Sequence, residues 1–190
     1  MIYPILAILL IGLAYFFISK KTNEETSQTK VDPNNNPYKD LRNLALNATA
    51  EQLQLKLSDN KVEIYGVIMD WDLEEGTATL ISFSTGDASL YLSSGGGYIG
   101  SGGYDNVKTA INSLIAISEK HLNKATLSET TELPEKNGLT FYFLTNKGKY
   151  RATEKMANIE NESSSWLDLF NEVNKLITEI RVVSENKTNN

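Results

Sequence analysis

Apolar residues recur every three or four positions in three parts of the chain, which predicts three amphipathic helices. The first covers Tyr38 to Leu46 and the second covers Asp105 to Leu122. Ser163 to Ser165 supply an N-cap for the third, which has the clearest helical repeat: Trp166, Leu169, Phe170, Val173, Leu176, Ile177 and Ile180. Thr49 to Gln52 has the spacing of a capping box, so we expect a further helical turn through Leu57.

Five other runs alternate apolar with polar residues or are rich in β-branched and aromatic residues, which is typical of strands. They are Val62 to Asp70, Thr77 to Ser84, Ser89 to Ser93, Leu139 to Thr145 and Lys149 to Met156. Short links that contain glycine predict hairpins between neighbouring runs. The order predicts an α+β domain over residues 38–183, with helices on the faces of a five-stranded antiparallel sheet. Residues 184–190 are expected to form a disordered polar tail.

The N-terminal run from Ile2 to Ile18 contains no charged residue. At the rise of an α-helix it spans about 25 Å, enough for the hydrocarbon core of a bilayer. A cleaved signal peptide would need basic residues before the run and small residues at a cleavage site, and the sequence has neither. We therefore expect residues 1–21 to be a retained transmembrane anchor, followed by a flexible polar linker over residues 22–37.

Positive charge predicts the orientation of this anchor. Lys20, Lys21 and Lys30 follow the apolar run, and neither Lys nor Arg precedes it. The positive-inside rule then places the domain in the cytoplasm, at the inner membrane of a bacterial cell. An extracytoplasmic domain is the alternative.

Composition narrows the functional classes. The formal net charge of −6 argues against a nucleic-acid-binding surface, which needs clustered cations. The chain has no cysteine and one histidine, so disulfides, thiolate metal sites and multi-histidine metal sites are excluded. The sequence predicts no metal and no cofactor.

The most unusual stretch is Ser93 to Gly103, which holds half of the twelve glycines. Gly95, Gly97 and Gly100 match the dinucleotide fingerprint, but antiparallel strands before them and the missing acidic residue after them argue against such a site. Three roles remain: close packing, anion binding with help from the next helix, or contact with a protein partner. The candidate binding residues are Ser94, Gly95, Gly96, Gly97, Tyr98, Ile99, Gly100, Ser101 and Lys108.

Two further candidates have ordinary explanations. Asp70, Asp72, Glu74 and Glu75 lack the residue pattern of an EF-hand, so we interpret them as a solvated acidic turn. His121 lies near the end of a predicted helix with no acidic partner near it in sequence. We interpret it as a surface or helix-end imidazole rather than a catalytic base, and predict no catalytic residue.

Two resemblances bear on function. The order of elements over residues 38–183 resembles the roadblock, longin and profilin folds, which implies a mostly non-catalytic platform for partners. The run from Asp87 to Gly100 is similar to an S-L-Y-x-S-x-G-G-G-x-I-G signature of an uncharacterised family of bacterial proteins, and this similarity implies no activity.

These observations favour a single-pass membrane protein with a non-enzymatic interaction or regulatory domain. The alternative is a small-ligand or nucleotide-binding sensor or enzyme that uses Gly95 to Gly103 to hold an anion. The sequence leaves open whether the domain is a monomer or a homodimer.

Overall fold

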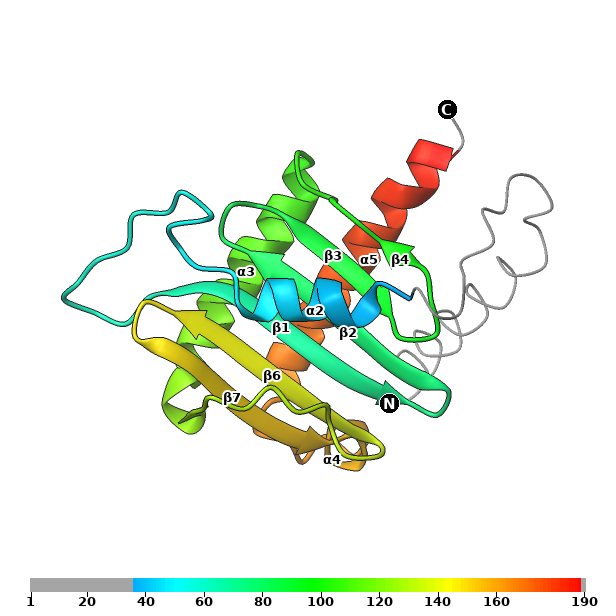
Figure 1. Ribbon diagram of the computed structural model, residues 1–190. Helices are drawn as coiled ribbons and strands as arrows, with labels where there is room; N and C mark the ends of the chain where they lie inside the picture. The colour runs from blue at the N-terminus through cyan, green and yellow to red at the C-terminus, as the bar shows by residue number, and fades with distance from the viewer. Residues whose placement is uncertain (1–35, 189–190) are drawn as a thin grey trace. The chain divides into compact units, whose positions relative to one another are not determined.

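The computed structural model describes residues 36–188, and the predicted transmembrane anchor and most of the predicted linker lie outside them. From Pro37 onwards the described residues form one compact unit. It is an α+β domain built on a seven-stranded antiparallel sheet with helices on its faces (Figure 1). Among the described helices, none has the length and apolar character needed to cross a membrane.

The strands of the sheet are hydrogen-bonded in the order β4-β3-β2-β1-β6-β7-β5. Five long strands lie where alternation predicted them, and two strands of two residues each correct the predicted count of five. A two-residue strand is too short to show a period of two in the sequence. The bounds are β1 Ile64–Leu73, β2 Gly76–Phe83, β3 Ala88–Leu92, β4 Gly97–Tyr98, β5 Thr126–Leu127, β6 Gly138–Thr145 and β7 Gly148–Lys155.

The three predicted helices are present, with differences at their ends. The helical elements are α2 Tyr38–Leu46, α3 Asp105–His121, the 3₁₀ turn η2 Leu122–Lys124, α4 Met156–Glu160 and α5 Leu167–Thr188. Thr49 and Gln52 do exchange the hydrogen bonds of a capping box, but Gln54 has a φ of 57° and no helix follows. Helix α5 continues to Thr188, so it includes most of the predicted polar tail.

Helices α3 and α5 pack together on one face of the sheet, and α2 lies on the other (Figure 1). On the α5 side, Trp71 meets Phe170 edge to face with ring centroids 5.6 Å apart. On the α2 side, Leu46 belongs to an apolar cluster with Ile68 and Tyr142. Because neighbouring strand residues point to opposite faces, the central strands β1 and β6 bury both of their faces.

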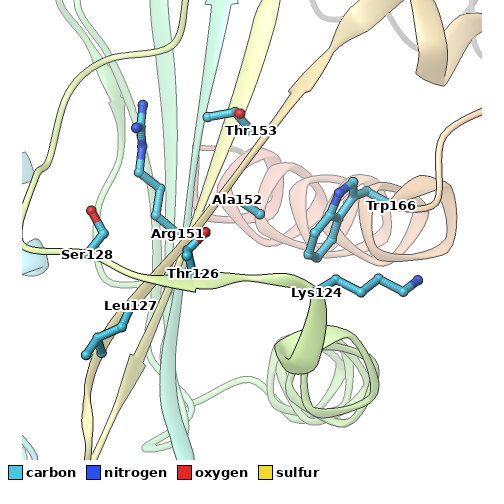
Figure 2. Close-up of a pocket in the computed structure, with 8 residues that line it drawn as sticks. All are labelled: Lys124, Thr126, Leu127, Ser128, Arg151, Ala152, Thr153 and Trp166. Atoms are coloured by element: carbon cyan, nitrogen blue, oxygen red, sulfur yellow. The ribbon is translucent and has the colours of Figure 1, made fainter.

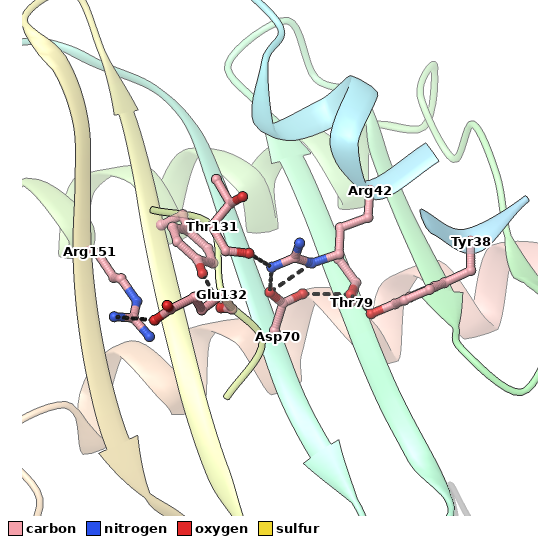
Figure 3. A network of polar contacts seen from close by, with 8 residues as sticks. Tyr38, Arg42, Asp70, Thr79, Thr131, Glu132 and Arg151 are labelled. Atoms are coloured by element: carbon pink, nitrogen blue, oxygen red, sulfur yellow. Dashed lines mark hydrogen bonds and ion pairs between the residues drawn. The ribbon is translucent and has the colours of Figure 1, made fainter. Parts of the chain in front are cut away.

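A buried ion pair joins α2 to the sheet (Figure 3). Arg42 donates to Asp70 Oδ2 from Nε at 3.0 Å and from Nη2 at 2.5 Å. Thr79 donates to Asp70 Oδ1 at 2.6 Å, and the hydroxyl of Tyr38 lies 2.8 Å from that of Thr79. Asp70 is fully buried inside β1, so its assignment to a solvated acidic turn was wrong.

Candidate functional site

The glycine stretch connects β3 to α3 and contains β4. Gly95, Gly96, Gly97, Gly100 and Gly103 all have positive φ values, between 66° and 141°. Residues with side chains rarely adopt this backbone, so glycine lets the chain turn sharply twice before α3 begins.

The glycines have two different surroundings. A Cβ atom added to Gly97 would lie 2.1 Å from the carbonyl oxygen of Leu90, because β3 and β4 pair at this point. One added to Gly102 would lie 2.2 Å from Asp87 Oδ1. Gly95, Gly96, Gly100 and Gly103 have nothing within 4 Å of such an atom. Close packing therefore explains Gly97 and Gly102, and turn geometry explains the other four.

Several backbone amides of the stretch donate hydrogen bonds within the domain. The N–H of Gly95 donates to Leu92 O at 3.0 Å, and that of Ser101 donates to Ala88 O at 3.0 Å. The N–H of Gly100 donates to Ser89 Oγ at 3.2 Å. These bonds fasten the loop to β3, and they leave fewer amides to receive an anion.

Two apolar side chains between β4 and α3 face solvent. Ile99 is 69% exposed and Tyr104 is 37% exposed. Tyr98 is half-buried towards α5, where burial and the nearby carboxylate of Glu185 raise the pKa of its phenol to about 12, against a smaller opposite effect of Arg181. Tyr98 thus anchors the loop while Ile99 faces solvent.

The remaining predicted binding residues do not all lie at one exposed place, as the prediction of a single site would require. Ser94 is exposed at the turn after β3, and Ser101 is buried. The aliphatic chain of Lys108 packs against Gly86, in the turn between β2 and β3. Asp105 places a negative charge in the first turn of α3. An anion at this helix start would therefore face a carboxylate.

His121 is buried at the end of α3 and has an acidic partner that sequence reasoning missed. Its Nε2 lies 2.8 Å from Asp168 Oδ1, and Lys124 Nζ lies 2.9 Å from its Nδ1. Burial alone would raise the pKa of Asp168, but the hydrogen bond and charge of His121 outweigh it and lower that pKa. Asp168 is 47 residues away on α5, so only the packing of α3 on α5 could have revealed the pair.

A pocket of about 330 Å³ opens at the other edge of the sheet, beside β5 and β7 (Figure 2). Its lining residues are Lys124, Thr126, Leu127, Ser128, Arg151, Ala152, Thr153 and Trp166. None of them belongs to the glycine stretch. The pocket could not be predicted because its walls come from three separate parts of the chain.

The other acidic candidates do not form a metal site. Asp72 accepts a hydrogen bond from the N–H of Asn137 at 2.8 Å, and Glu74 and Glu75 are exposed. Within residues 36–188, no three His, Asp or Glu side chains are placed to hold a metal ion.

Comparison with known proteins adds no further assignment: no protein-family model, curated protein or solved structure matches the chain.

Proposed function

We propose that the chain is a membrane-anchored, non-enzymatic interaction protein of bacterial type, and that its glycine stretch contacts a protein partner. The observation that carries this proposal is Ile99, an apolar side chain that is 69% exposed directly after β4 in a fastened loop. Single exposed apolar residues are common on protein surfaces. Ile99 differs because Tyr104 is exposed on the same loop and because backbone hydrogen bonds hold that loop in place.

The fastened loop would favour binding. A loop that is ordered before it meets its partner loses little conformational entropy in the complex. Aromatic and large apolar side chains are enriched in the buried centres of protein interfaces. Ile99 and Tyr104 would supply that centre, and Ser94 and Asp105 would supply part of a polar rim.

The predicted anchor would determine where in the cell the domain meets its partner. Residues 1–21 would hold the domain at the inner membrane, and Lys20, Lys21 and Lys30 favour a cytoplasmic position. Confinement raises the effective concentration of the domain near a membrane partner. The resemblance to roadblock, longin and profilin folds supports a platform role by analogy.

The alternative, a small-ligand sensor or enzyme with an anion held by Gly95 to Gly103, has less support. Gly95, Gly100 and Ser101 already donate their amides within the domain. Lys108 packs on Gly86, and Asp105 opposes a bound anion. The contacts therefore favour the interaction role.

Site-specific crosslinking tests the proposal. A photoreactive amino acid replaces Tyr104 in the full-length protein, which is irradiated in native membranes with and without Ile99→Asp. We expect one discrete adduct that Ile99→Asp abolishes, because a buried carboxylate without a partner is costly. Leu44→Asp is the control, since Leu44 is equally exposed on α2. An adduct that Leu44→Asp removes and Ile99→Asp leaves intact would reject the glycine stretch as the contact.

A further inference from the structure

We infer that the pocket beside β5 and β7 binds a small organic anion that carries a carboxylate or phosphate group. This site is separate from the glycine stretch and goes beyond the proposed interaction role. Its volume of about 330 Å³ is within the range of small-ligand sites. The lining combines two cationic side chains, three hydroxyl groups and one indole: Lys124 and Arg151; Thr126, Ser128 and Thr153; and Trp166.

The pocket exists because β5 is short. It pairs with β7 only at Thr126 with Arg151 and at Leu127 with Tyr150. The N–H of Ser128 also donates to Lys149 O at 2.8 Å, so Lys149 turns its backbone groups towards this edge. Backbone groups in an antiparallel strand alternate between its two edges. Thr153 is four residues after Lys149, so its N–H points to the same edge of β7 as the backbone groups of Lys149. β5 does not reach this position, and the N–H of Thr153 can therefore donate to a ligand.

Arg151 supplies charge at one end of the pocket, beside Ser128 (Figure 2). Its Nε is buried and has no hydrogen-bond partner among the described residues. Its Nη1 lies 3.8 Å from Glu132 Oε2, but that carboxylate is 72% exposed and solvent weakens its effect. A buried guanidinium nitrogen without a partner is costly, and an anion would satisfy it.

Lys124 supplies the second charge, at the end of the pocket formed by Trp166 (Figure 2). An ammonium group has three hydrogens to donate. Lys124 Nζ lies 2.9 Å from His121 Nδ1 and donates to Ser165 O at 3.2 Å. At least one hydrogen remains for a ligand, because the contact with His121 uses one only where Nδ1 is the acceptor. Trp166 is held by Phe141 and Phe143, with ring centroids 5.9 and 6.1 Å away, so the wall beside Lys124 is fixed.

Calorimetric titration of the full-length protein in detergent tests this inference, with inorganic phosphate and succinate as separate probes. We expect saturable binding of at least one probe, and the probe that binds identifies the preferred group. Succinate has a carboxylate for each end of the pocket, so Arg151→Gln and Lys124→Gln should each weaken its binding by about tenfold or more, as expected for loss of a charged hydrogen bond. Phosphate should lose as much with the one substitution that removes the charge it contacts. Lys155→Gln is the matched control, because it removes the same charge from β7 outside the pocket lining.

A second variant covers the case in which Arg151→Gln fails to fold. Thr126→Tyr fills the pocket from an exposed position on β5, so the fold should be kept and binding lost. Circular dichroism checks that each variant is folded. The inference is overturned if neither probe binds saturably. It is also overturned if Thr126→Tyr binds normally, or if Lys155→Gln weakens binding as much as Arg151→Gln does.

Discussion

Substitutions of Gly97 and Gly100 test whether β4 of the glycine stretch is held against β3. Gly100 has a φ of 66° and open space around it, so Gly100→Ala should cost about 1 kcal/mol from backbone strain alone. Gly97→Ala adds a contact of 2.1 Å with Leu90 O, and strain plus overpacking should cost about 3 kcal/mol. Urea unfolding of both variants measures whether Gly97→Ala lowers the free energy of unfolding more than Gly100→Ala does. Equal costs would show that β4 is not held against β3.

The pair of Arg42 and Asp70 is expected to dominate the stability of α2 on the sheet. Arg42→Met leaves a fully buried carboxylate without its cation, which should lower the free energy of unfolding by about 3–5 kcal/mol. The double variant Arg42→Met/Asp70→Leu should be more stable than Arg42→Met, since no charge is then buried alone. Chemical denaturation measures both. A cost below about 1 kcal/mol for Arg42→Met would mean that water reaches Asp70.

At the scale of elements, the contact of β4 with α5 depends on Tyr98. Its pKa is raised to about 12, so the fold favours the neutral phenol. The resulting stability is present below pH 10 and is lost as pH rises through about 12, because the unfolded chain ionises first. The difference between the ultraviolet titrations of the wild type and of Tyr98→Phe should show one tyrosinate transition, near pH 12. Over this pH range the wild type should lose stability relative to Tyr98→Phe. A difference transition near pH 10 instead of near pH 12 would contradict the packing of Tyr98.

The sequence predicted the elements that have a long, regular pattern. Strands β1, β2, β3, β6 and β7 and helices α2, α3 and α5 follow from periods of two and of about 3.6. Strands β4 and β5 and helix α4 are too short for either period. Asp70 was misread because its partner, Arg42, is 28 residues away on α2. The pocket arises where β5 stops pairing with β7, and no local pattern marks such an end.

For the whole molecule, we propose that an anchor over residues 1–21 holds at the membrane a domain that presents Ile99 to a partner. The absence of cysteine helps to test it, since a single introduced thiol reports on one position. Ile99 and Leu44 make a matched pair because they are 69% and 71% exposed, on different elements of the domain.

The most direct measurement is the rate at which maleimide modifies Ile99→Cys and Leu44→Cys, each in the full-length protein. The rates are compared between native membranes and purified protein in detergent. We expect Ile99→Cys to react several-fold more slowly in native membranes, because a partner covers it, and Leu44→Cys to react equally in both. Equal rates for Ile99→Cys, or slowing at Leu44→Cys alone, would contradict the glycine stretch as the docking surface.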